Sequence, residues 1–250
     1  DSNLELESEF DINAIDSMVL ESILIDDKII MVGTLKEADS NHSDVVILKY
    51  SLEGELIQES TFGTANNEIG TSIKSITDTT YLFTGSTNGF LGQDFDLYLV
   101  KLDTSLNVIW EQIHGYNPTQ DNDDELGVNS LVGHDGKIYS GITTETYGEG
   151  GKDFLVYILN DEGGFENGYS FGMAGDESLV SLTQFSDSSF TLIGISESNM
   201  AYGINDIFIV HLDRFVGGAH QQFTSILDTS SIEETLGILG VNLIYGAYYK

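Results

Sequence analysis

The sequence contains no cysteine, one proline and only nine lysine and arginine residues among 250, against 41 acidic residues. Without cysteine the chain has no disulfide, no thiol nucleophile and no zinc site built on thiolates. Its formal net charge of -32 leaves no basic cluster that would bind phosphate backbones or anionic lipid heads. We therefore expect neither nucleic acid nor an anionic membrane surface as a partner.

Long apolar runs are also missing. No window reaches about 18 consecutive apolar residues, the length that a membrane-spanning helix needs, so we expect no membrane insertion. Hydrophobic residues still make up 40% of the chain, which is enough to bury a real core. The chain begins at Asp1 instead of Met, which fits a leader peptide already removed and fits an arbitrary boundary equally well.

An internal repeat runs through the sequence. Five short apolar runs end in glycine at spacings of 52, 56, 53 and 52 residues, at Gly33, Gly85, Gly141, Gly194 and Gly246. After each of the first four glycines, an aspartate opens an aliphatic run, at Asp44, Asp96, Asp153 and Asp206. A ring then closes another run, at Phe62, His114, Phe171 and Phe223.

Each period contains about four β-like runs, separated by polar turns such as Asp26-Asp27 and His134-Asp135-Gly136. No helical period of 3.6 competes with this pattern. A repeated unit of four short strands has the size of a β-propeller blade, whereas a β-sandwich has no reason to repeat at a fixed interval. The sequence therefore predicts an all-β fold, a five-bladed β-propeller.

The whole chain, residues 1–250, is predicted to be a single propeller domain with repeat units at about 11–70, 71–127, 128–180 and 181–237. Residues 238–250 and 1–10 would form a composite closing blade, which removes exposed sheet edges. The two termini contain no run that corresponds to the third, aspartate-led strand. Either the closing blade has three strands or a second copy supplies one, which would link subunits by β-augmentation.

The run at residues 85–115 reads GSTNGFLGQDFDLYLVKLDTSLNVIWEQIHG. It resembles a secreted propeller repeat of bacteria and archaea with the approximate consensus GSTxSFGxGxxDxYLVKLDxxGNxxW. Looser matches occur at residues 141–164 and 205–213. The resemblance implies a propeller fold and a surface or secreted scaffold or binding module. It implies no particular activity.

One acidic position recurs where an outer strand leads into the next unit, at Asp16, Glu68, Glu125 and Glu177. If these carboxylates face a common axis, they suit Ca²⁺, which prefers six to eight oxygen ligands. Alternatively, each carboxylate accepts backbone N–H groups and fixes its own turn. Converging carboxylates would raise one another's pKa values, so that a counter-ion would be expected.

A second candidate calcium site is the acidic insertion at residues 121–127, which includes Asp121, Asp123 and Glu125. Its alternating carboxylates have the spacing that can surround a cation. It is not an EF-hand, because the glycine is at the seventh position and Val132 occupies the place of the bidentate glutamate. A solvated acidic loop is the alternative interpretation.

The sequence offers little catalytic chemistry. The repeated aspartates are of the residue type that cleaves glycosidic bonds, but a residue present in every unit more plausibly fixes a turn, because catalytic pairs arise from single units. No nucleophile elbow, zinc-protease helix or phosphate-binding loop is present. The five histidines are dispersed, and His114 occupies a Phe position where packing is expected.

A ligand surface is predicted in the loops between second and third strands, where aromatic residues recur with polar neighbours. The aromatic residues are Phe90, Tyr147 and Tyr202, and the polar ones are Asn88, Glu145 and Asn199. These could form a lectin-like surface. Alternatively, the rings fill space between blades.

Taken together, the sequence predicts a non-enzymatic scaffold or recognition module that is secreted or lies on the cell surface. Its partner would be a protein, a second copy or a glycan, with no cofactor unless it is Ca²⁺. A carbohydrate-binding lectin is the first alternative, and a carboxylate-dependent glycosidase or lyase is the second.

Overall fold

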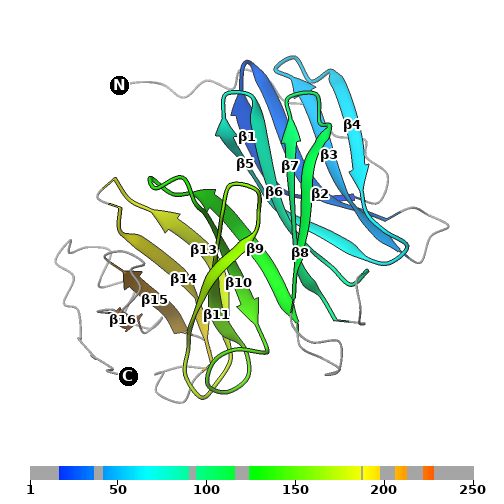
Figure 1. Ribbon diagram of the computed structural model, residues 1–250. Helices are drawn as coiled ribbons and strands as arrows, with labels where there is room; N and C mark the ends of the chain where they lie inside the picture. The colour runs from blue at the N-terminus through cyan, green and yellow to red at the C-terminus, as the bar shows by residue number, and fades with distance from the viewer. Residues whose placement is uncertain are drawn as a thin grey trace, which may run out of the picture.

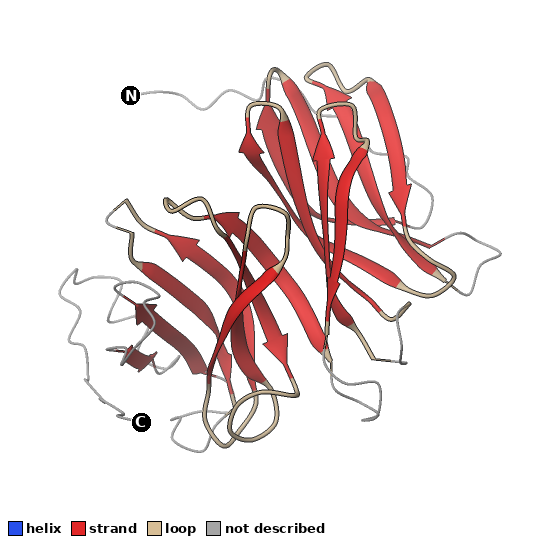
Figure 2. Ribbon diagram, in the orientation of Figure 1, coloured by secondary structure: helices blue, strands red, loops and turns tan. Residues whose placement is uncertain are grey.

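A computed structural model of the protein describes residues 17–36, 42–89, 94–115, 124–186, 188–197, 206–212 and 222–227. Every regular element in these ranges is a β-strand, and the strands form four antiparallel sheets of four strands each (Figure 1, Figure 2). This confirms the all-β prediction. The proposed closing blade, residues 238–250 and 1–10, lies outside the described residues, so the five-bladed ring stays a prediction.

Each sheet consists of four strands that follow one another along the chain and pair with their sequence neighbours. The first sheet contains β1 (Ser17–Ile25), β2 (Lys28–Lys36), β3 (Ser43–Ser51) and β4 (Leu56–Phe62). The second contains β5 (Glu68–Thr77), β6 (Thr80–Thr87), β7 (Asp96–Asp103) and β8 (Val108–His114). The third contains β9 (Glu125–Val132), β10 (Ile138–Thr144), β11 (Asp153–Leu159) and β12 (Phe165–Phe171). The fourth contains β13 (Glu177–Gln184), β14 (Phe190–Ser196), β15 (Asp206–Leu212) and β16 (Gln222–Leu227).

Tight polar turns connect the first and second strands of the sheets. Asp26 and Asp27, with φ values of 47° and 55°, form the two-residue turn between β1 and β2. Positive φ at both central residues gives a hairpin turn whose twist matches that of the flanking strands. Gly136 and Ser188 also have positive φ, 81° and 69°, in the turns before β10 and β14. These turns lie where polar residues interrupt the apolar runs of the sequence.

A separate hydrophobic cluster lies between each pair of consecutive sheets. Representative members are Ile47 and Phe83 between the first and second sheets, Leu99 and Leu155 between the second and third, and Phe154 and Phe208 between the third and fourth. The Phe154 and Phe208 ring centroids are 4.9 Å apart. Burial of side chains of this size contributes roughly 1.5–3 kcal/mol each. Face-to-face packing of the sheets therefore forms the core.

The strands differ in burial according to their place in the sheet. β10 and β11 are buried along their whole length, whereas β4 and β8 are mostly exposed or half-buried. Inner strands of the second and third sheets are covered by neighbouring sheets on both faces. This explains why the run after each of those repeated aspartates is almost continuously apolar.

The fourth sheet has one face that the described residues do not cover. Ile193 and Ile195 of β14 are 41% and 42% exposed. In β6 of the second sheet, by contrast, every residue except Thr80 is buried. The alternate residues of β14, including Phe190 and Leu192, pack against the third sheet. The opposite face of β14 therefore carries apolar side chains of the kind that another sheet would bury.

Candidate functional site

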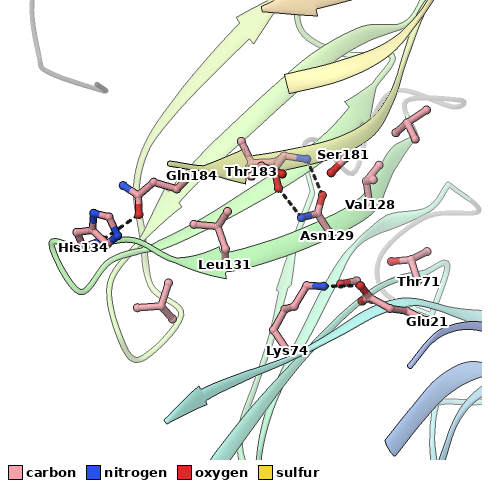
Figure 3. A pocket seen from close by; sticks show the side chains of 14 residues that line it. Glu21, Thr71, Lys74, Val128, Asn129, Leu131, His134, Ser181, Thr183 and Gln184 are labelled. Carbon is pink, nitrogen blue, oxygen red and sulfur yellow. Dashed lines mark hydrogen bonds and ion pairs between the residues drawn. The ribbon is translucent and has the colours of Figure 1, made fainter. Parts of the chain in front are cut away.

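A polar cavity of about 510 Å³ lies between the first strands of the four sheets (Figure 3). β1 contributes Glu21, and β5 contributes Ser72 and Lys74. β9 and β13 provide much of the remaining wall, including Asn129 and Ser181. Since the first strands of all four sheets face this space, the cavity lies where the repeated units meet.

Each first strand contains a β-bulge at the corresponding place. The register shifts between Val19 and Glu21 in β1, between Gly70 and Ser72 in β5, between Gly127 and Asn129 in β9 and between Leu179 and Ser181 in β13. A bulge adds one residue, bends the strand and changes the direction of the side chains beside it. The residues that follow the bulges all line the cavity, and they are Glu21, Ser72, Asn129 and Ser181.

In the second and fourth sheets the bulges also explain the glycine of the second strand. A Cβ atom on Gly85 would lie 2.2 Å from the carbonyl oxygen of Ile69. A Cβ atom on Gly194 would lie 2.1 Å from the carbonyl oxygen of Ser178. Because the backbone of the first strand approaches this closely, only glycine fits at these two positions.

Two of the four residues after the bulges form bonds to the next sheet. The Glu21 carboxylate accepts a hydrogen bond from the Ile73 N–H at 2.8 Å and pairs with the Lys74 ammonium group. Asn129 forms two bonds with Leu182: its Oδ1 accepts from the N–H and its Nδ2 donates to the carbonyl, each at 2.8 Å (Figure 3). These contacts join the first sheet to the second and the third sheet to the fourth along the cavity wall.

The described part of the cavity wall carries no net formal charge. Of the described residues that line it, Glu21 and Lys74 are the only Asp, Glu, Lys or Arg residues, and they neutralise each other. Hydroxyl, amide and aliphatic side chains form most of the remaining wall, and at one end the His134 N–H donates to Gln184 Oε1 at 3.0 Å. Among the described residues, no partner is present for the buried Ser72 hydroxyl. The wall can therefore form hydrogen bonds without favouring either sign of charge.

The recurring glutamates lie at the start of three first strands and are fully buried. Glu68 accepts hydrogen bonds from the Thr64 N–H at 2.9 Å and from the Thr87 hydroxyl at 2.6 Å. Glu177 accepts from the Met173 N–H and the Ser196 hydroxyl, each at 2.6 Å. Each of these two carboxylates thus fixes the loop that enters its own first strand, the second of the two roles considered above.

The residue that precedes each glutamate connects two sheets. Its side-chain oxygen accepts a hydrogen bond from a backbone N–H group of the previous sheet, and the donor is the residue directly before the repeated aspartate. The N–H groups of Ser43, Phe95 and Lys152 donate to Asn67, Asp124 and Asp176, at 3.2, 2.9 and 3.1 Å respectively. The same polar link therefore recurs at all three described sheet junctions.

Repeated aspartates lie next to glycines, and their carboxyl groups occupy the space that a larger side chain at the glycine would need. A Cβ atom on Gly172 would be 1.4 Å from Asp153 Oδ1 and 2.8 Å from Glu177 Oε2. The same relation holds at Gly63, whose Cβ atom would be 2.2 Å from Asp44 Oδ1 and 2.6 Å from Glu68 Oε2. Carboxyl groups from two neighbouring sheets therefore face one point, and glycine leaves the room for them.

Burial alters the acidity of these aspartates. Burial, together with the nearby charges of Glu177 and Glu149, raises the pKa of Asp153 to about 7. Burial likewise raises the pKa of Asp96 to about 6, with contributions from Asp94 and Asp124. Desolvation and like charges both disfavour the ionised form, so the fold favours the protonated carboxyl at these junctions.

The structure places Glu68, Glu125 and Glu177, predicted as calcium ligands, at three different sheet junctions. Within the described ranges, no three His, Asp or Glu side chains gather closely enough to hold a metal ion. Asp16, Asp121 and Asp123 lie outside the described residues, and calcium binding by them stays a prediction. The pairing of Ser17 with Leu35 matches that of Glu68 with Thr87, so Ser17 occupies the place of the repeated glutamate in β1.

Of the predicted ligand surface, the structure describes Tyr147, Asn88 and Glu145, while Phe90, Tyr202 and Asn199 lie outside the described residues. Tyr147 is half-buried and packs against the hydrophobic cluster between the second and third sheets. This position matches the alternative interpretation, in which the ring fills space between neighbouring sheets. Asn88 accepts a hydrogen bond from the Asn67 N–H at 2.8 Å, and Glu145 pairs with Lys152 at 3.3 Å. Each of the three therefore has a contact within the fold.

Two features of the sites were not found from the sequence. The first is the acidic or amide residue directly before each repeated glutamate, visible as the pairs Asn67-Glu68, Asp124-Glu125 and Asp176-Glu177. The second is the set of β-bulges in the first strands, which the recurring glycines of the second strands could have indicated. The cavity residues at equivalent positions are a glutamate, an asparagine and two serines, so no single residue type recurs in every unit and marks them.

No protein-family model matches the chain, and a search of curated proteins finds no match. In the part of the chain that the structure describes, no helix has the length and apolar character required to cross a membrane.

Proposed function

We propose that the protein is a non-enzymatic scaffold or recognition module, secreted or exposed on a cell surface, whose sheets are the blades of a five-bladed β-propeller. The observation that supports this most directly is the use of the recurring polar residues within the fold itself, where they fix loops and strands. Residues that occur once per repeat, such as Glu68 and Glu177, form hydrogen bonds that hold the strands in place. A repeated acid with this role serves the architecture, which leaves recognition to the surfaces and the cavity.

Two observations on the fourth sheet support ring closure by a fifth sheet. The first is the apolar face of β14, where Ile193 and Ile195 are not covered by described residues. The second is Asp206, which is 1% exposed and whose two carboxylate oxygens have no hydrogen-bond partner among the described residues. At two other junctions the equivalent aspartate, Asp44 or Asp153, lies beside the same glycine as the glutamate of the following sheet. A fifth sheet formed by the two ends of the chain would supply both contacts.

Net charge and repeat type support an extracellular location. A chain with a charge of -32 repels copies of itself at low ionic strength and is better accommodated where salt or divalent cations screen it. The repeat at residues 85–115 resembles those of secreted propellers. Protein partners, self-association and glycans are the partner classes that this setting allows.

The test is the native mass of the full chain by size exclusion with light scattering, with calcium and again with a chelator. A monomer near 27.4 kDa in both conditions is the expected result for a ring that closes by itself. An oligomer would show that the closing blade takes a strand from another copy. If the chelator disperses that oligomer, calcium takes part in the assembly.

A carboxylate-dependent glycosidase or lyase is the enzymatic alternative, and incubation with a panel of polysaccharides tests it. We expect no product from any of them. Turnover that is abolished by one Asp→Asn substitution would overturn the proposal of a non-enzymatic module, since a general acid or base would then be at work.

A further inference from the structure

We propose that the cavity between the first strands is a binding site for an uncharged carbohydrate of roughly one or two sugar rings. This inference rests on the proposed recognition function and names its ligand class and its site. A cavity of about 510 Å³ falls within the range of small-molecule sites, which is roughly 300–1,000 Å³.

The residues after the bulges make the cavity. Glu21 and Asn129 have side chains long enough to reach the next sheet, and both are bonded to its backbone. Ser72 and Ser181 occupy the equivalent positions of the second and fourth sheets, but their side chains end after one hydroxyl group. Long side chains thus stiffen two sides of the cavity, and short ones leave the space between them open.

The wall offers the hydrogen bonds that a sugar requires. Ser181 and Thr183, which each carry a hydroxyl group, line the space together with Lys74. A hydroxyl can donate one hydrogen bond and accept others, as can each hydroxyl of a sugar. The buried Ser72 hydroxyl, which has no partner among the described residues, adds a further polar group to the same wall.

The charge of the wall favours a neutral ligand. Because Lys74 is paired with Glu21, neither an anion nor a cation finds an uncompensated charge among the described residues that line the cavity. The chain as a whole, at -32, repels anionic sugars. Val128, Leu131 and Val180 provide aliphatic surface for the C–H faces of a sugar ring, and Val180 is 60% exposed.

The experiment measures binding to the full-length chain by isothermal titration and saturation-transfer NMR. The neutral probes are glucose, maltose and cellobiose, and the charged ones are glucuronate and glucosamine. We expect at least one neutral sugar to bind with a Kd of about 1 mM or lower, and more tightly than either charged probe. Failure of all neutral sugars to bind at about 10 mM would overturn the inference.

Ser181→Leu fills the cavity and is expected to weaken binding of the best sugar about tenfold or more. Ser178→Leu is the matched control, since Ser178 is also a half-buried serine of β13 but does not line the cavity. Thr183→Val removes one exposed hydroxyl without changing side-chain shape, so it tests the site even if Ser181→Leu fails to fold. It should weaken binding severalfold. Equal affinity in wild type, Thr183→Val and a folded Ser181→Leu would place the ligand elsewhere.

Failure of the inference differs from failure of the proposed function. Absence of sugar binding in a folded, catalytically inactive protein overturns the carbohydrate site and leaves a scaffold or protein-binding module. Hydrolysis of a bound sugar overturns the non-enzymatic function and leaves the site in place.

Discussion

At the scale of single residues, the buried Asp153 and Glu177 carboxyl groups bring two acids from neighbouring sheets to one point beside Gly172. Two ionised groups at this place would repel each other in surroundings with little water. Protonation of Asp153 relieves that repulsion, and the raised pKa of about 7 reflects burial first and the charge of Glu177 second. The junction between the third and fourth sheets is therefore expected to depend on pH.

Asp153→Asn should stabilise the protein at neutral and alkaline pH. A pKa raised from 3.8 to about 7 means that the folded state binds the proton more tightly than the unfolded chain. Binding of this proton stabilises the folded state, and this contribution to the free energy of unfolding is fully present below about pH 4 and is lost as the pH rises to about 7. At about pH 8 we expect the free energy of unfolding of the variant to exceed that of the wild type by about 1–2 kcal/mol in urea denaturation.

The control for this substitution is Asp78→Asn, in an exposed turn, where the change should stay within about 0.5 kcal/mol. The wild type should lose stability between about pH 4 and 7 more steeply than Asp153→Asn does. A variant that is less stable than the wild type at pH 8 would contradict the assignment of a protonated Asp153.

Gly172→Ala tests the space at the same junction. The added Cβ atom would lie 1.4 Å from Asp153 Oδ1, so the Asp153 side chain or one of the two sheets must shift. We expect a loss of about 2–4 kcal/mol in the free energy of unfolding. Gly136→Ala is the comparison, because no atom lies near its Cβ position and only the φ of 81° opposes alanine. It should cost about 1 kcal/mol, and an equal effect of both changes would disprove the steric argument.

At the scale of strands, the bulge in each first strand sets both the cavity and the link to the next sheet. Asn129→Ala removes two hydrogen bonds to the Leu182 backbone and leaves a buried N–H and carbonyl without partners. We expect a loss of about 2 kcal/mol in thermal or urea unfolding. Asn167→Ala, at an exposed residue of β12, should change stability by less than about 0.5 kcal/mol. Similar values for the two variants would show that Asn129 does not join the sheets.

The strands could be predicted from the sequence because their signals are local. The glycine, aspartate and ring positions recur at nearly fixed spacing, and each marks a point within one four-stranded unit. Asp96, Asp153 and Asp206 indeed begin the third strands of their sheets. Alternation and turn residues are enough to define such elements.

The sites could not be predicted in the same way, because they depend on how units face each other. The cavity takes Glu21, Ser72, Asn129 and Ser181 from equivalent positions, but only the two serines are of the same type. The period also revealed that Glu68 and Glu177 recur, without showing whether they point to an axis or to their own loops. Only the packing of one sheet against the next decides this.

At the scale of the whole molecule, the fourth sheet provides a test of the missing neighbour. Ile195→Lys places a charge on the face of β14 that described residues leave 42% exposed. If a fifth sheet packs there, the variant should lose about 2–3 kcal/mol of stability, since the charge would be buried without a partner.

Val108→Lys serves as the reference for this face, because Val108 is 48% exposed on the outer strand β8, where no further sheet is expected. Its stability should change by less than about 0.5 kcal/mol. If Ile195→Lys is tolerated equally well, that face of β14 is open to solvent.

Closure of the ring by both ends of the chain is the central claim, and the distance between those ends tests it most directly. The absence of cysteine allows spin labels to be attached at Leu4→Cys and Leu243→Cys alone, with the distance measured by pulsed electron resonance. Four paired strands span only about 15 Å, so we predict a narrow distance distribution below about 25 Å, label linkers included. A broad distribution extending well beyond that distance in the monomer would contradict a five-bladed ring closed by its own termini.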